Sequence, residues 1–255
     1  MRLDVFLLHK KLASSRSHAQ ELIKGHQVYQ RKSDGSTVYL SKSNHHVDEN
    51  QEDIFVEEGP ANRYVSRGGL KLEGALQQAK INPQGLAVLD VGISTGGFTD
   101  CVLKAGAGSV LGVDVGHGQV HSTLLGEPRL KILEGLNARE IDQNSDVVQN
   151  MPSGGFDLIV MDVSFISITL IIPHLVPLLK SDGRLLSLVK PQFEVGPEGL
   201  GKGGLVKDPG LYSGVEDRVR KICFGAGLTV QDYFASPIEG KDGNKEFFVL
   251  AAKKF

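Results

Sequence analysis

The chain has 255 residues, of which 40% are hydrophobic and 23% charged, as in an ordinary globular protein with room for one sizeable domain and a smaller one. A formal net charge of −2 excludes a uniformly basic protein, and only two cysteines, far apart in the chain, argue against a disulfide framework. The longest strongly apolar stretch, residues 166–179, contains Thr169, His174 and two prolines and is too short for a membrane-spanning helix. We therefore expect a cytoplasmic protein.

The first 58 residues have the pattern of a small α+β unit. We expect amphipathic helices at 2–13 and 14–25, with Ser14 or Ser15 as the N-cap of the second and Gly25 just past its end. Short strands are expected in "QVYQ", "STVYL" and "DIFVEE", with a turn at Asp34-Gly35. Residues 1–32 hold seven Lys/Arg against two acidic residues, a net of +5, and residues 33–58 hold one against seven, a net of −6. Residues 59–69, which contain Gly and Pro, are expected to be an interdomain linker.

From residue 70 onward, strands alternate with helices. The expected helices are 70–79, one that follows the glycine turn at 92–97 and runs through Leu103, 167–179 and 210–227. The expected strands lie in "AVLDVG", "SVLGVDVG", "LKILEG", "FDLIVMDVSF", "GRLLSLVKPQF", "LTVQDYFASP" and "NKEFFVLAAKK". This alternation predicts a doubly wound, mostly parallel α/β sheet that ends in an antiparallel hairpin.

The segment "LDVGISTGGFTD", residues 89–100, is a strand end crowded with glycine. Its spacing fits neither a dinucleotide fingerprint nor a phosphate-binding loop. Asp90 and Gly92 would face a ligand beyond the carboxyl ends of the strands, and Asp114, which ends the next strand, would accept hydrogen bonds from a ribose. A ribose without phosphates suggests S-adenosylmethionine, whose ammonium Asp90 could attract directly or through water. The alternative is a tight turn in which Asp90 only starts a helix.

Four charged residues, Lys71, Asp162, Lys190 and Glu246, lie at or near the ends of expected strands and indicate which kind of atom receives the methyl group. The fourth strand lacks the Asn/Asp-Pro-Pro-aromatic turn typical of amine methylation, and neither cysteine ends a strand as a cytosine C5 nucleophile would. A lysine could act as base toward a ribose 2′-hydroxyl, or it could orient that oxygen as an ammonium, and the pattern leaves both roles open. The expected catalytic residues are Lys71, Asp162, Lys190 and Glu246.

The blocks "YVSRGGLKL", "STGGFT", "DVGHGQ", "NARE", "DVSFIS", "VKPQFEVG" and "GGLVKDP" resemble, in order and over nearly the whole chain, the TlyA (hemolysin A) family of FtsJ-like rRNA 2′-O-methyltransferases. The resemblance implies a Rossmann-like class I methyltransferase sheet at 70–255 and a Lys-Asp-Lys-Glu tetrad on the four charged residues. It also implies 2′-O-methylation of cytidine in ribosomal RNA, with S-adenosyl-L-methionine as cofactor. The cofactor-binding residues expected from the strand ends and the matching blocks are Asp90, Gly92, Ser94, Thr95, Gly96, Gly97, Phe98, Asp114, Val115, Asn137 and Asp162.

Residues 1–58 resemble the αL-type RNA-binding domain of a small-subunit ribosomal protein. Arg16 and "LIKGHQV" at 22–28 match its pattern, whereas "VYQRKSDG" departs from the usual V-x-V-N-G at the first turn. The resemblance implies phosphate contacts, which position RNA without reading its sequence, and communication between domains through the linker around Arg63–Arg67. The expected RNA-binding residues are Lys10, Lys11, Arg16, Lys24 and Arg67.

Two other classes of function compete with an RNA methyltransferase. A hemolysin or cytolysin, as the family's second name suggests, should show a secretion signal and membrane-active segments, and the sequence shows neither. A non-catalytic RNA-binding protein on a methyltransferase scaffold should lack Lys190 or Asp114, and both are present. We therefore expect ribosomal RNA or ribosomal subunits as partners, and we expect no obligate protein partner, membrane or metal ion.

Overall fold

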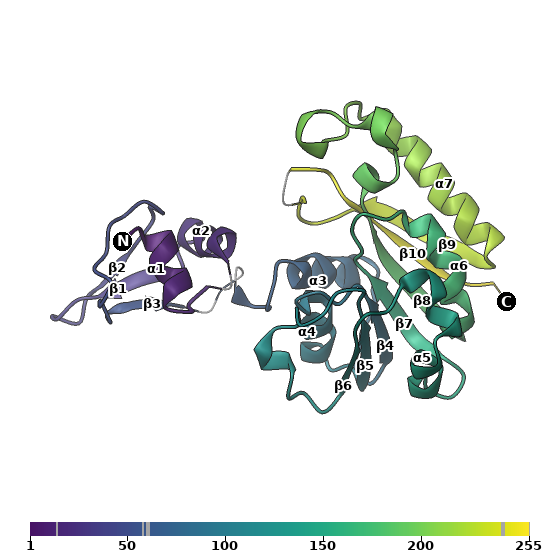
Figure 1. Ribbon diagram of the computed structural model, residues 1–255, viewed down its shortest axis with the longest axis horizontal. Coiled ribbons are helices and arrows are strands. Elements are labelled where there is room, and N and C mark those ends of the chain that lie inside the picture. The colour runs from purple at the N-terminus through teal and green to yellow at the C-terminus, as the bar shows by residue number, and fades with distance from the viewer. Residues whose placement is uncertain (14, 58, 60–61, 241–242, 255) are drawn as a thin grey trace. The chain divides into compact units, whose positions relative to one another are not determined.

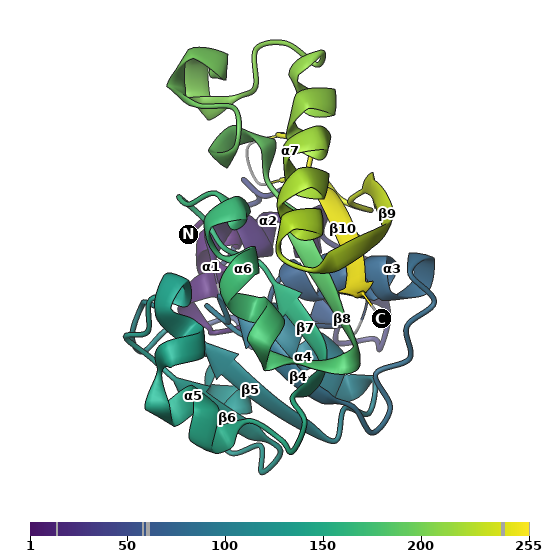
Figure 2. The same ribbon diagram turned by 90° about the vertical axis from the view of Figure 1, so that its right-hand side faces the viewer.

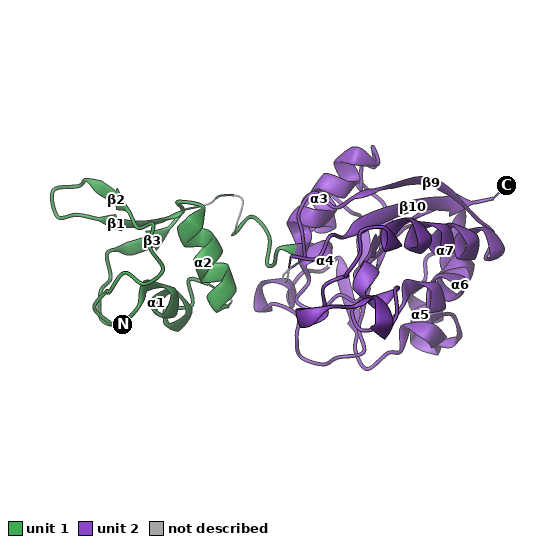
Figure 3. Ribbon diagram, turned by 90° about the horizontal axis from the view of Figure 1, so that it is seen from above, with its two compact units in different colours: residues 1–67 green, residues 68–255 purple. Residues whose placement is uncertain are grey.

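The computed structural model describes residues 1–13, 15–57, 59, 62–240 and 243–254. The chain divides into two compact units, residues 1–67 and 68–255 (Figure 3). Each unit has its own layers and is described by itself.

The N-terminal unit packs two helices on a three-stranded antiparallel sheet. Its elements are α1 (Leu3–His9), α2 (Arg16–Lys24), β1 (Val28–Arg31), β2 (Thr37–Tyr39) and β3 (Ile54–Val56), with strand order β2-β1-β3. Ser15 is the N-cap of α2, because its side chain accepts a hydrogen bond from the amide of His18 at 3.1 Å. The alternative cap, Ser14, lies outside the described residues. Leu7, Leu22 and Val28 belong to the buried core that joins helices and sheet.

A buried carboxylate ties the two helices of this unit together. The side chain of Asp4 is fully buried and accepts hydrogen bonds from Arg2 at 3.0 Å, from Nε of Arg16 at 2.9 Å and from Gln20 at 3.0 Å. These donors, with that of Arg2 first, hold the pKa of the Asp4 carboxyl well below its usual range. Asp4 is thus ionised at neutral pH and fixes α1 against α2.

The C-terminal unit is a seven-stranded sheet between two layers of helices. Its strand order is β6-β5-β4-β7-β8-β10-β9; all neighbours are parallel except β10, which is antiparallel to both β8 and β9. Helices α3 and α4 cover one face, and α5, α6 and α7 cover the other (Figures 1 and 2). The helices are α3 (Gly68–Gln78), α4 (Gly97–Lys104), α5 (Ser145–Asn150), α6 (Ile172–Leu175) and α7 (Leu211–Gly225). The strands are β4 (Ala87–Val91), β5 (Ser109–Val113), β6 (Leu130–Leu133), β7 (Phe156–Met161), β8 (Leu179–Val189), β9 (Leu228–Ala235) and β10 (Phe247–Lys253).

The predicted α/β fold is therefore confirmed, with two local differences. The expected helix at 167–179 is broken into a 3₁₀ turn (Ile168–Leu170), α6 and a second 3₁₀ turn (Val176–Leu178), because Pro173 and Pro177 lack the amides that a continuous helix needs. Helix α5 was not predicted; the Asn144 side chain caps it by accepting from the amides of Asp146 and Val147. Among the described residues, no helix combines the length and apolar character needed to cross a membrane.

The Asp4 contacts lead to a testable expectation for the stability of the N-terminal unit. Asp4→Asn removes the charge and turns an amide group toward guanidinium donors, so we expect this unit to lose about 1–2 kcal/mol of unfolding free energy at pH 7. Because folding lowers the pKa of Asp4, the difference in unfolding free energy between wild type and Asp4→Asn is fully present above the pKa of an unfolded aspartate, about 4. This difference shrinks as the pH falls below about 4. Urea unfolding read by pulsed amide labelling would follow this unit separately from residues 68–255. Asp48→Asn, on an exposed turn, is the control, and an equal loss in both variants would contradict the assignment.

Candidate active site

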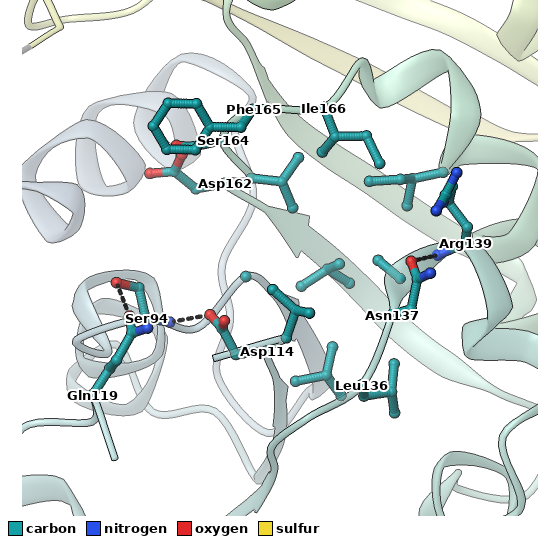
Figure 4. Close-up of a pocket in the computed structure, with 17 residues that line it drawn as sticks. Ser94, Asp114, Gln119, Leu136, Asn137, Arg139, Asp162, Ser164, Phe165 and Ile166 are labelled. Atoms are coloured by element: carbon teal, nitrogen blue, oxygen red, sulfur yellow. Dashed lines mark hydrogen bonds between the residues drawn. The ribbon is translucent and has the colours of Figure 1, made fainter. Parts of the chain in front are cut away.

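A pocket of about 540 Å³ opens at the carboxyl ends of β4, β5 and β7 (Figure 4). This edge is where ligands bind in open parallel sheets, since the chain leaves each strand there in a loop. Figure 4 shows Asp114 and Ser94 together on one side of the pocket, with Asp162 and Ser164 on another and Asn137 from a third segment. The lining residues are Val91, Gly92, Ser94, Val113, Asp114, Val115, Gln119, Leu136, Asn137, Ala138, Arg139, Asp162, Val163, Ser164, Phe165, Ile166 and Ile171.

Gly92 ends β4 in a conformation that requires glycine. Its φ is +86°, and a Cβ placed on it would lie 2.5 Å from the carbonyl oxygen of Asp162. The amide of Asp162 donates to the carbonyl of Val91 at 3.0 Å. The ends of β4 and β7 are therefore in backbone contact, which places Asp162 directly beside the glycine turn.

Asp114 carries an oriented carboxylate into the pocket from the end of β5. Its Oδ2 accepts from the amide of Ser94 at 2.8 Å, and its Oδ1 accepts from the amide of Gly116 at 2.7 Å. Each carboxylate oxygen still has a lone pair for a further donor, such as a ribose hydroxyl. Val115, next in the chain, is 73% exposed and lines the same pocket, so it offers an apolar surface beside the carboxylate.

Asp90 lies behind the pocket wall and is fully buried. Thr99 Oγ1 donates to its Oδ2 at 2.6 Å, whereas its Oδ1 has no hydrogen-bond partner among the described residues. Burial raises the pKa of this carboxyl to about 7, and the Thr99 hydrogen bond opposes the rise. Asp114 in the pocket therefore fits a ribose, and the buried carboxyl of Asp90 behind the pocket wall favours a cationic group in the pocket, such as the ammonium of S-adenosylmethionine.

The four expected catalytic residues form two ion pairs at this edge of the sheet. Lys71 on α3 pairs with Glu246, which immediately precedes β10. Lys190, after β8, lies with its Nζ 2.6 Å from Asp162 Oδ1 and donates to Ser164 Oγ at 2.8 Å. Antiparallel pairing sets Phe247 opposite Val189, and this register carries Glu246 to the strand end that holds Lys190. Each lysine charge is thus balanced by a carboxylate.

The other expected cofactor residues divide into two groups. Gly92, Ser94, Asp114, Val115, Asn137 and Asp162 line the pocket, and the Asn137 side chain also accepts from the amide of Arg139 at 3.1 Å. Asp90, Thr95, Gly96, Gly97 and Phe98 are not among the lining residues. Phe98 is buried with its ring stacked on Phe248, 6.3 Å between centroids, so it anchors the start of α4.

The expected RNA-binding residues all lie in the N-terminal unit. Lys10, Lys11 and Lys24 are exposed, and the ammonium of Lys10 is 5.7 Å from the ring centroid of Phe6. Arg16 and Arg67 already have acidic partners: Arg16 binds Asp4, and Arg67 lies 3.1 Å from Glu21. These two arginines therefore have a structural contact in addition to any contact with RNA.

Several pocket residues were not predicted from the strand ends, and Phe165 is the most unusual of them. It is 91% exposed, has a φ of +64° and lies with its ring centroid 5.2 Å from that of Phe193. It lines the pocket with its neighbours Val163, Ser164 and Ile166. Their position in the loop directly after Asp162 was the available signal, since residues that follow a strand end share its pocket.

Comparisons with known proteins agree with this geometry. Residues 64–253 match the family described as FtsJ-like methyltransferase, and residues 1–29 match the S4 domain. The chain is 37% identical over 248 residues to the 16S/23S rRNA (cytidine-2′-O)-methyltransferase TlyA of Mycobacterium tuberculosis (strain CDC 1551 / Oshkosh), covering 97% of this chain and 88% of that one. It is 35% identical over 247 residues to Hemolysin A of Brachyspira hyodysenteriae, covering 97% and 98%. A solved structure of a hemolysin candidate from Streptococcus thermophilus is 34% identical with a TM-score of 0.73 and covers 100% of this chain and 88% of that chain.

These matches confirm the predicted methyltransferase, with S-adenosylmethionine as its cofactor, and the predicted RNA-binding type of the N-terminal domain. The chain belongs to the FtsJ-like methyltransferase family, in the branch that contains TlyA and hemolysin A.

Proposed function

We propose that this protein methylates the ribose 2′-oxygen of a cytidine in ribosomal RNA, in the cytoplasm, with no obligate protein partner. The main support is the position of Lys190, which directly follows β8, pairs with Asp162 and donates to Ser164, two residues that line the pocket. A relative that is 37% identical is named for this reaction, which supports cytidine in ribosomal RNA as the substrate.

Lys190 suits the orientation of a hydroxyl oxygen. A lysine ammonium has three donors; one binds Ser164 Oγ, and the charged nitrogen also lies 2.6 Å from Asp162 Oδ1. Another donor can bind the substrate 2′-oxygen and hold it toward the pocket, which favours the positioning role over the base. S-adenosylmethionine supplies an activated methyl group when it is bound. The methyl carbon would leave the cofactor sulfur as the new oxygen–carbon bond forms, and the hydroxyl proton would pass to water. Lys71 and Glu246 form a second ion pair at this edge of the sheet and add no net charge there.

The N-terminal residues 1–58 are proposed to bind the RNA backbone, with residues 59–69 as the linker and 70–255 as the catalytic domain. Support comes from the S4 match over residues 1–29 and from the exposed Lys10, Lys11 and Lys24. Arg16 uses its Nε for Asp4, so its terminal nitrogens still have donors for a phosphate. Such contacts add affinity that falls as salt is raised, without selecting a sequence.

Methyl transfer to unmodified ribosomal subunits tests the proposed function directly. Labelled S-adenosylmethionine should modify one or a few nucleotides, and each modified nucleotide should resist alkaline cleavage, because a 2′-O-methyl group blocks attack by that oxygen on its own phosphate. Mapping the resistant linkages identifies the base. Cofactor binding without incorporation into either subunit would favour the non-catalytic scaffold and contradict the proposal.

Lys190→Ala should reduce methyl transfer by about 10²-fold or more, since it removes the group that holds the reacting oxygen in position. Cofactor affinity should stay within a few-fold of wild type, because Lys190 is not among the residues that line the pocket. Single-turnover rates and calorimetric titration with S-adenosylmethionine separate the two effects. Lys180→Ala is the matched control: Lys180 pairs with Asp157 near the other ends of β7 and β8. Full turnover by Lys190→Ala would remove it from the catalytic set.

Asp90 should make cofactor binding pH-dependent. Its carboxyl, with a pKa of about 7 in the free protein, must ionise to attract an ammonium, so affinity should rise with pH and fall by up to about tenfold per unit below pH 7. Binding at pH 6 should then release a proton, seen as a dependence of the calorimetric heat on the buffer. Asp90→Asn should bind more weakly, with a flat profile between pH 5.5 and 7.5. A wild-type profile as flat as that of Asp90→Asn would refute the ammonium contact.

A further inference from the structure

We propose that Glu194 is a positioning residue that fastens the segment after β7 to the turn after β8, so that Ser164 and Phe165 stay beside Lys190 at the mouth of the pocket. Two segments are involved: residues 163–168, called the β7 loop, and residues 190–194, called the β8 turn. The catalytic consequence rests on the proposed function, whereas the contact itself can be tested without any substrate.

The Glu194 carboxylate is buried and reaches the β7 loop with both oxygens. Its Oε2 accepts from Ser167 Oγ at 2.6 Å, and its Oε1 accepts from the amide of Ile168 at 2.9 Å. Burial raises the pKa of this carboxyl; the hydrogen bonds from Ser167 and Ile168 and the charge of Arg218 on α7 oppose the rise. A carboxylate is costly to bury, so its placement on one backbone amide and one hydroxyl indicates a specific role at this position.

The β7 loop is anchored at its two ends and held in a strained conformation between them. Just before the loop, the amide of Asp162 donates to the carbonyl of Val91 at 3.0 Å. At the end of the loop, the amide of Ile168 donates to Glu194 Oε1 at 2.9 Å. Between these anchors, Phe165 has a φ of +64° with its side chain 91% exposed. A bulky residue in left-handed backbone costs free energy and persists only where its surroundings enforce it. The loop would relax if one anchor were released.

The β8 turn contacts the β7 loop at three places. Lys190 Nζ donates to Ser164 Oγ at 2.8 Å, the ring of Phe193 lies 5.2 Å from that of Phe165, and Glu194 binds Ser167 and Ile168. Only the last contact reaches the backbone of the loop. Glu194 therefore fixes the position of Phe165 and of the Ser164 hydroxyl that orients Lys190, although it does not line the pocket itself.

Hydrogen exchange of the cofactor-bound protein tests the contact without RNA. In Glu194→Ala, the amides of the β7 loop should exchange at least tenfold faster, with the Ile168 amide affected most. Glu194→Gln should exchange nearly as slowly as wild type, because its carbonyl can accept from Ile168 while its amide donates to Ser167 Oγ. Glu216→Ala, which removes an ion pair with Arg220 on α7, is the control and should leave the loop unchanged. Unaltered protection in Glu194→Ala would overturn the proposal.

Kinetics then separate positioning from simple stabilisation. Glu194→Ala should lower kcat by about 10–100-fold and raise the KM for ribosomal subunits, since small displacements of positioning groups cost this much. Rates are divided by the concentration of molecules that bind S-adenosylmethionine, so loss of folded protein cannot imitate the effect. Glu194→Gln should recover most of kcat, and Ser167→Ala should give a smaller loss than Glu194→Ala.

Each outcome decides the proposal. Normal kcat and KM per cofactor-binding molecule in Glu194→Ala, with only a lower melting temperature, would reduce Glu194 to a structural residue. A Gln variant as defective as the Ala variant would also overturn the hydrogen-bond account. If the wild-type protein transfers no methyl group to ribosomal RNA, the proposed function fails, and the exchange measurement alone still decides whether Glu194 holds the loop.

Discussion

The antiparallel course of β10 between β8 and β9 is the constraint on which the active site depends. A parallel strand in this place would start at the amino edge of the sheet and carry Glu246 away from the pocket. Because β10 runs in reverse, its first residue follows Glu246 and pairs with Val189, one residue before Lys190. Glu246 thereby reaches Lys71 on α3, and residues from four distant parts of the sequence share one edge.

The charges at this edge fall into two kinds. Asp162 and Glu246 are each neutralised by a lysine, so they hold protein groups in place at a modest electrostatic cost. Asp90 and Asp114 have no lysine or arginine partner among the described ion pairs; backbone amides bind Asp114, and Thr99 binds Asp90. A cofactor with an ammonium and ribose hydroxyls offers a positive charge to Asp90 and hydrogen-bond donors to Asp114. Asp162 lines the same pocket as Asp114, so lysine-paired carboxylates and carboxylates without a lysine partner meet at this edge of the sheet.

The strand ends and their glycine turn could be predicted from the sequence because they depend on local pattern. Apolar runs define β4, β5, β7 and β8, and the polar residue that ends each run lies at the carboxyl edge by the geometry of parallel sheets. Glu194 could not be predicted, because its hydrogen bonds go to Ser167 and Ile168, which lie 27 and 26 residues away in sequence. Phe165 could have been placed at the pocket from its position after Asp162, whereas its left-handed backbone could not be predicted. The broken helix at 167–179 was foreseeable from its two prolines, whose missing amides outweigh the apolar periodicity.

Arg16 is a residue expected to bind RNA that also has a structural contact. Its Nε binds the buried Asp4, so part of its positive charge is already balanced inside the N-terminal unit. That contact orders the guanidinium before any ligand arrives and lowers the conformational entropy that a phosphate contact would cost. Lys10 contacts the ring of Phe6, but none of the exposed lysines Lys10, Lys11 and Lys24 has an acidic partner among the described ion pairs, so their long side chains lose more freedom on binding. Affinity for a phosphate should therefore be concentrated at Arg16, with Lys10, Lys11 and Lys24 adding long-range attraction that weakens as salt screens it.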